Sequence, residues 1–197
     1  MTDTQKKPLW KNELVWLFLL TSGLFAILYS KFILGGYAYV FTDTGADTMQ
    51  INYAQYGLFS SLFRSGESGY VLQAGLGMDV SSYYPAYLIP YNLLILLAPQ
   101  RLLPWAVLAS AYLKMITISL VGYLFYRKLM QDGIGTMAAA LAWTFSGYVI
   151  LWGQHYGFCT CMALFTVFMY FLQCYLNGEQ RWKSAGLVIT VTMLLIS

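Results

Sequence analysis

Charged side chains are scarce in this chain. They make up 10% of its 197 residues, against roughly a quarter in soluble domains, while 59% of the residues are hydrophobic. This composition is typical of an integral membrane protein. The net charge of +3 is small and scattered along the chain. It excludes a nucleic-acid-binding protein, because that function needs Lys and Arg clustered on one face.

Cysteine and histidine are also rare. The three cysteines, Cys159, Cys161 and Cys174, fall in one apolar segment, which excludes a disulfide framework of the secreted type. Cys159 and Cys161 would point roughly 200° apart on a helix and are poorly placed to share a metal ion. The sequence contains no P-loop, no Ser/His/Asp nucleophile arrangement and no His/Cys metal cluster.

Long apolar runs are what the chain does contain. A helix needs about 20 residues to cross a hydrocarbon core of roughly 30 Å. Counting one run that stops short at Ser197, we predict an all-α bundle of about five spans: Leu14–Leu34, Leu103–Tyr126, Gly135–Trp152, Phe158–Leu176 and Ser184–Ser197.

One further apolar run, Tyr87–Ala98, has 12 residues and is interrupted by Pro90, so we expect a re-entrant or interfacial segment. With five spans, the Lys and Arg residues of the N-terminus and of two short loops fall on one side, which is the pattern of cytoplasmic loops. We therefore predict a cytoplasmic N-terminal tail (1–13) and a large extracytoplasmic loop (35–102). Within that loop, the spacing of Ile51, Ala54, Leu58 and Leu62 predicts an amphipathic surface helix over Thr48–Phe63.

Four of the eight acidic residues lie in this loop, and two of them follow the first span closely. Asp43 and Asp47 are four residues apart with Gly45 between them, so a helix or a turn could bring their carboxylates together. Such a pair could bind a divalent cation, or one carboxylate could act as a base. The alternative is that both are solvated loop residues.

Several short motifs resemble the N-terminal part of the YfhO family of bacterial multi-spanning membrane proteins. The matches occur in order over nearly all of residues 14–176: Asp47-x-x-Gln50, Gly75-Leu76-Gly77-Met78-Asp79, Tyr83-Tyr84, Pro90-Tyr91-Asn92-Leu93-Leu94 and Phe145-Ser146-Gly147-Tyr148. Members of that family are several times longer. The resemblance therefore suggests a single membrane domain (1–197) that is the N-terminal part of a longer one.

Proteins of that family resemble the GT-C glycosyltransferases, which take a sugar from a polyprenyl-phosphate carrier in the bacterial cell membrane. The resemblance implies that Asp47 is the catalytic base, with Asp43 in support, and that the acceptor is lipoteichoic acid or another wall polymer. Gln50 and Asp79 stand in the matching motifs and are candidate substrate-binding residues.

Basic residues near the outer face could stabilise the phosphate leaving group. Arg64 is a candidate, although it could equally be a solvated helix end. Lys114 lies 11 residues into its predicted span, and a charge at that depth indicates a functional site. Its partner is either in a later part of the chain or the carrier phosphate. His155, in a short outer loop, could assist substrate binding or contact lipid headgroups.

Two other functions remain open from the sequence. Lys114 could be the binding charge of a transporter or flippase for a lipid-linked or polar substrate. Alternatively, the chain could be a non-catalytic fragment that associates with a partner.

Overall fold

The structure is a computed structural model that describes residues 12–41, 47–67, 69–72, 77–81, 89–130, 132–179 and 181–196. Of the described residues, 80% are helical. The helices are α1 (Glu13–Leu28), α2 (Ser30–Leu34), the π-helix η2 (Thr48–Tyr53), α3 (Ala54–Ser65), α5 (Pro90–Leu97), the 3-10 helix η3 (Gln100–Leu102), α6 (Leu103–Leu129), α7 (Gly133–Thr144), α8 (Gly147–Trp152), α9 (Tyr156–Leu176) and α10 (Arg181–Ile196). A two-residue hairpin pairs β1 (Tyr70–Val71) antiparallel with β2 (Met78–Asp79).

Among the residues that the structure describes, three helical segments are long and apolar enough to cross a membrane: Gln100–Leu129, Gly133–Trp152 and Tyr156–Leu176. They match three of the five predicted spans. The other two are shorter apolar helices, with 16 residues each in α1 and α10. The helix that begins at Glu13 is interrupted at Tyr29, where the backbone leaves helical geometry (φ −101°, ψ 16°) before α2 begins. The chain is therefore a helical protein with three membrane-compatible helices.

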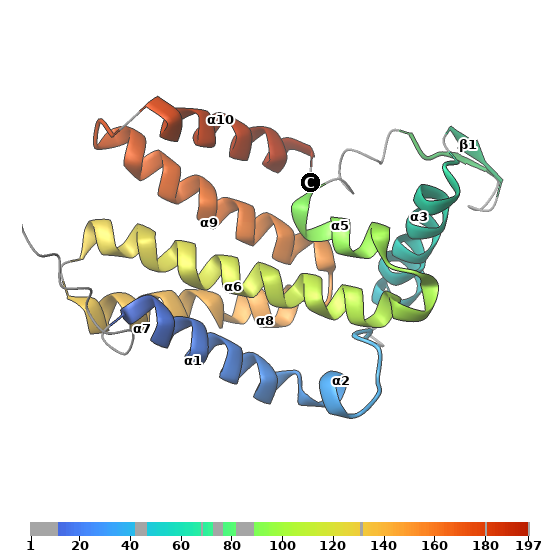
Figure 1. The fold of residues 1–197 in the computed structure, drawn as a ribbon, viewed down its shortest axis with the longest axis horizontal. Coiled ribbons are helices and arrows are strands. Elements are labelled where there is room, and N and C mark those ends of the chain that lie inside the picture. Colours follow the sequence, from blue (N-terminus) through green and yellow to red (C-terminus); the bar gives the residue numbers. More distant parts are fainter. Residues whose placement is uncertain are drawn as a thin grey trace, which may run out of the picture.

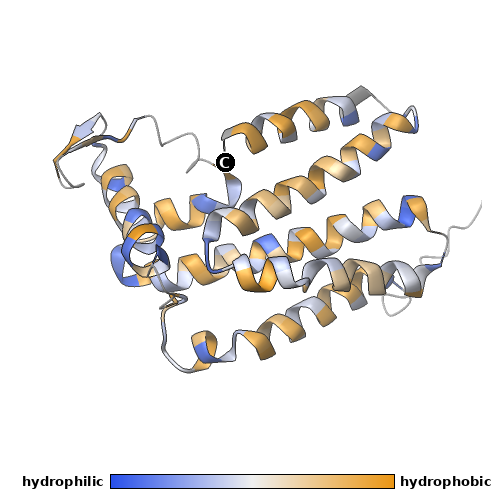
Figure 2. Cartoon of the chain, turned by 180° about the vertical axis from the view of Figure 1, so that it is seen from behind, coloured by the Kyte–Doolittle hydropathy of each residue, from blue (hydrophilic) through white to orange (hydrophobic). Residues whose placement is uncertain are grey.

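Helix α6 lies at the centre of the bundle. It packs against α1, α5, α7 and α9, while α10 packs against α9 (Figure 1). Figure 2 shows that the long helices are hydrophobic along most of their length. Large apolar side chains are exposed on them, including Ile27, Leu151 and Leu195. An apolar outer surface is what a lipid environment requires.

The helix that follows Asp47 is present, but its buried side differs from the predicted stripe. Ile51 is 48% exposed and Ala54 is exposed, whereas Tyr56, Phe59 and Leu62 are buried. The reason is the π-helix over Thr48–Tyr53, because a π-turn contains an extra residue and shifts the phase of the positions that precede it.

Helix α5 is the described part of the run expected to be re-entrant or interfacial. Its eight residues give a length of about 12 Å, too short to cross the membrane. Pro90 stands at the first helical position, where its missing N–H costs nothing. The helix packs against α6 and α3, so it joins α3 to the bundle.

Candidate functional site

Lys114 is buried inside the bundle, with 2% of its surface exposed. Its Nζ atom donates a hydrogen bond to the backbone carbonyl of Tyr156 at 3.1 Å. It forms no ion pair with any carboxylate of the described residues. The partner of this ammonium group is therefore a neutral backbone oxygen, which the sequence did not suggest.

The same contact places the Lys114 side chain beside the start of α9. Tyr156 is the first residue of α9 and follows the short turn after α8. Helix α6 has 27 residues and is about 40 Å long, more than a hydrocarbon core of roughly 30 Å. Lys114 stands 11 residues after Leu103, near the middle of α6, and its side chain reaches the carbonyl of the first residue of α9.

Tyr156 joins four parts of the chain. Its hydroxyl donates a hydrogen bond to the carbonyl of Tyr39, and its ring stacks with those of Tyr39 (5.8 Å between centroids) and Tyr56 (5.3 Å). Its carbonyl accepts from both Lys114 and Thr160, each at 3.1 Å. These contacts link the loop after α2, helix α3, helix α6 and the first turn of α9.

The tyrosines that contact Tyr156 are buried as well. Tyr56 donates a hydrogen bond to the side chain of Asn92 at 3.2 Å, which ties α3 to α5. Burial raises the pKa of Tyr39 above its usual range, so this phenol stays neutral. Sequence reasoning missed this cluster. The one available signal was the abundance of tyrosine, 17 residues in all.

Asp47 lies at the start of η2, beside the same turn. It is half-buried, and the next residue, Thr48, is fully buried and donates to the carbonyl of Gln154 at 3.3 Å. Gln154 is two residues before Tyr156. The same short turn therefore contacts both Lys114 and Thr48, the residue after Asp47. A π-helix immediately after Asp47 fits a functional role, because such helices occur frequently at functional sites.

His155 is in that turn too. It is half-buried, and its ring packs against Trp152 and Phe158 at 5.7 Å from each centroid. These two aromatic rings give the imidazole a partly apolar setting.

The structure separates the remaining candidates from this turn. Arg64 is exposed near the C-terminal end of α3, and its Nε atom donates to the carbonyl of Ser60 at 3.2 Å. It stands 17 positions after Asp47 on one continuous helix, which corresponds to about 25 Å. Arg64 is therefore at the opposite end of the helix from Asp47.

Asp79 lies in β2, beyond that far end of α3 (Figure 1). Its carboxylate accepts hydrogen bonds from the backbone N–H and the hydroxyl of Ser81, at 3.0 and 2.7 Å. These bonds lower the pKa of Asp79, since they favour the charged form. Gln50 is exposed on η2, three residues after Asp47.

Asp43 lies outside the described residues. Within the described ranges, no three His, Cys, Asp or Glu side chains are grouped so that they could hold a metal ion. A divalent cation held by Asp43 and Asp47 stays a prediction.

Comparisons with protein-family models, with curated proteins and with solved structures gave no match to this chain.

Proposed function

We propose that this chain is part of a membrane glycosyltransferase of the GT-C type. It moves a sugar from a polyprenyl-phosphate carrier to an extracytoplasmic acceptor such as lipoteichoic acid or another wall polymer. One structural observation supports the proposal most directly. Thr48, which follows Asp47, contacts Gln154, and Lys114 contacts Tyr156, so a carboxylate and a buried cation are attached to one short turn.

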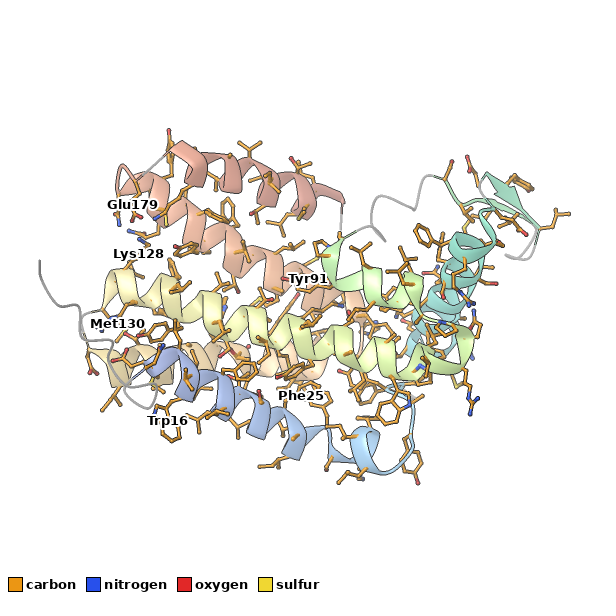
Figure 3. All side chains as sticks on the ribbon, viewed as in Figure 1. Trp16, Phe25, Tyr91, Lys128, Met130 and Glu179 are labelled. Atoms are coloured by element: carbon orange, nitrogen blue, oxygen red, sulfur yellow. The ribbon has the colours of Figure 1, made fainter. Side chains whose placement is uncertain are left out.

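The proposed topology has five spans, with α1 and α10 as the two shorter ones and α5 as a re-entrant or interfacial segment. The N-terminus lies in the cytoplasm of a bacterial cell. Lys128 and its partner Glu179 lie at the end of the bundle remote from α3, and Lys183 pairs with the same Glu179, as expected for cytoplasmic loops (Figure 3). The resemblance of the short motifs to the YfhO family suggests the same arrangement.

The proposed reaction is a direct displacement at the anomeric carbon of the sugar. The carboxylate of Asp47 takes the proton of an acceptor hydroxyl as its oxygen attacks that carbon. The bond from the anomeric carbon to the phosphate oxygen breaks, and polyprenyl phosphate leaves with the electron pair. A phosphate leaving group needs positive charge nearby, and Lys114, whose side chain reaches the first residue of α9, can supply it.

Sugar transfer in reconstituted membranes tests the proposal. The full protein is supplied with a polyprenyl-phosphate-linked sugar and a wall-polymer acceptor, and labelled product is counted. We expect Asp47→Asn to lower the rate by about 100-fold or more, the size of a general-base contribution. Glu67→Gln is the matched control, because Glu67 is an exposed carboxylate of the same loop. Transfer by Asp47→Asn at the native rate would rule out Asp47 as the base.

A transporter or flippase is the second candidate, and the burial of Lys114 favours it, since charges inside membrane proteins commonly mark substrate paths. It predicts that Lys114→Met stops movement of the lipid-linked substrate across the membrane, whereas Asp47→Asn does not. The glycosyltransferase proposal predicts that Asp47→Asn stops sugar transfer.

A further inference from the structure

A cavity of about 190 Å³ lies between α6, α7 and α9, which belong to the three membrane-compatible segments. Gly122, in its lining, stands eight residues after Lys114 and seven before the end of α6. At about 1.5 Å per residue, it is about 12 Å from Lys114 and about 10 Å from that helix end. The cavity is therefore separate from the turn that contacts Lys114, and it lies in the part of the bundle that a bilayer would surround. Its lining includes four aromatic side chains: Phe125, Tyr126, Trp143 and Phe165.

Two polar groups of the lining bond to each other and to the backbone. The indole N–H of Trp143 donates to the hydroxyl of Thr166 at 3.0 Å, and that hydroxyl donates to the carbonyl of Met162 at 2.8 Å. Neither group needs water or a polar ligand as a partner. Apolar cavities on the order of 150 Å³ stay dry and bind small hydrocarbons. The occupant that fits this lining is therefore apolar.

A glycine keeps part of the cavity open. Gly122 is buried in the interior of α6, where glycine is a poorer helix former than alanine. A Cβ atom there would be 3.7 Å from Cδ1 of Trp143 and 3.7 Å from Cγ2 of Thr166, which are ordinary contact distances. The helices therefore have room for a side chain at this position, and a large one would extend between two side chains of the cavity wall. The lack of a side chain at Gly122 leaves that space for a ligand.

Positive charge lies near one end of the cavity. Tyr126, in the lining, is two residues before Lys128, and Lys128 Nζ lies 5.7 Å from the ring centroid of Tyr170, which directly follows a lining residue of α9. Lys128 and Lys183 share the single carboxylate of Glu179, so this group of three carries a net charge of +1. An anionic lipid headgroup complements such a group. A second copy of the chain in the same orientation would bring the same positive charge, which is less favourable.

We propose that the cavity between α6, α7 and α9 binds one acyl chain of an anionic phospholipid of the surrounding membrane, with the lipid headgroup beside Lys128 and Lys183. The hydrocarbon packs on the aromatic lining and occupies the space beside Gly122. This lipid site does not depend on the proposed sugar transfer and is tested without it.

Fluorescence quenching by brominated lipids tests the site in the full chain, reconstituted in lipid nanodiscs. Bromine on an acyl chain quenches tryptophan fluorescence at close range, so the other five tryptophans are replaced by phenylalanine and Trp143 is the only emitter. Brominated phosphatidylglycerol, which is anionic, and brominated phosphatidylcholine are each mixed into unbrominated phosphatidylcholine. We expect quenching by the anionic lipid to saturate, and to reach half of its maximum at a mole fraction about fivefold lower, the effect of one elementary charge at a membrane surface.

A chain with Trp16 as its only tryptophan is the matched control. Trp16 is 49% exposed on α1 and does not line the cavity. Its quenching should rise in proportion to the brominated fraction, because it meets only the bulk lipid.

Variants connect the quenching of Trp143 to the cavity. Gly122→Leu is expected to raise the lipid fraction needed for half of the quenching by about tenfold or more, because the leucine excludes at least two methylene groups of the lipid. Gly122→Ala adds a methyl group at ordinary contact distances and should weaken binding less, which keeps the test valid if Gly122→Leu does not fold. Lys183→Gln should remove the preference for the anionic lipid.

Three results would contradict the site. Quenching of Trp143 in proportion to the brominated fraction, as for Trp16, would show contact with bulk lipid only. An unchanged response in Gly122→Leu would show that the lipid lies elsewhere. A lack of quenching by either lipid would show that protein, such as a second copy of the chain, covers the cavity.

Discussion

Two regions of the helix bundle differ in the partners of their charged side chains. At the end where α6 and α9 finish and α10 begins, Glu179 binds both Lys128 and Lys183 (Figure 3). These side chains are 16–26% exposed, and each has an opposite charge beside it. Near the start of α9, Lys114 is buried and has a neutral carbonyl as its partner.

The two kinds of charge differ in what they cost the folded protein. Paired charges near water contribute little to stability and need no further explanation. A buried charge without a counter-ion is costly, and inside a membrane protein such a charge commonly marks a functional site. Tyr156 accepts the Lys114 hydrogen bond and is itself packed between the rings of Tyr39 and Tyr56. Substitutions in this region should therefore have larger effects than substitutions at the Glu179 end of the bundle.

The largest effect on stability is expected for Tyr156→Ala. The substitution removes two ring contacts and the hydroxyl bond to Tyr39, and we expect it to lower the free energy of unfolding by about 3–5 kcal/mol. Unfolding by a denaturing detergent, followed through loss of helical circular dichroism, measures it. Tyr175→Ala, at an exposed position of the same helix, is the control and should change stability by less than about 0.5 kcal/mol. Equal losses in the two variants would show that Tyr156 has no central role.

A smaller effect is expected where α1 meets α6. The hydroxyls of Thr21 and Ser119 are 2.7 Å apart and both residues are fully buried. We expect Thr21→Val to cost about 1 kcal/mol, since it leaves the Ser119 hydroxyl unpaired. Thr192→Val on α10 removes a hydroxyl that bonds within its own helix and should cost less. A double-mutant cycle with Ser119→Ala should show coupling, and additive losses would contradict this contact.

The smallest effect on stability is expected for the ion pairs of Glu179, and it depends on pH. Lys128 and Lys183 lower the pKa of Glu179 from 4.5 to about 2. Because the folded-state pKa is lowered, the stabilisation is fully present above pH 4.5 and is lost as the pH falls towards 2. We expect Glu179→Gln to be slightly less stable than the native chain at pH 7, and the difference to disappear as the pH falls through about 2. A difference that persists at low pH, or that high salt does not reduce, would contradict a simple ion-pair contribution.

The sequence allowed prediction of the long helices but not of their interruptions. Three apolar segments were found because hydropathy over 20 residues is a strong signal. The break at Tyr29 and the π-helix after Asp47 involve no proline, so no local signal marked them. The π-helix also explains why the predicted apolar stripe over Ile51 and Ala54 was wrong.

The candidate site was only partly predictable for a related reason. Lys114 was recognisable as a charge in an apolar segment, but its contact with Tyr156 spans 42 positions in the chain. The pairing of Thr48 with Gln154 spans 106 positions. Contacts of this range depend on how the helices pack, which the order of apolar and polar residues does not specify.

Disulfide cross-linking tests most directly whether the start of η2, next to Asp47, lies against the turn that contacts Lys114. Cysteines are introduced as Thr48→Cys and Gln154→Cys in a chain whose three native cysteines are replaced by alanine, and the chain is oxidised in the membrane. The Thr48 hydroxyl is 3.3 Å from the carbonyl oxygen of Gln154, so the two segments are in direct contact. We predict rapid cross-linking of this pair and none for Glu67→Cys with Gln154→Cys. Failure of the first pair to cross-link, or equal cross-linking of both pairs, would contradict a shared site for Asp47 and Lys114.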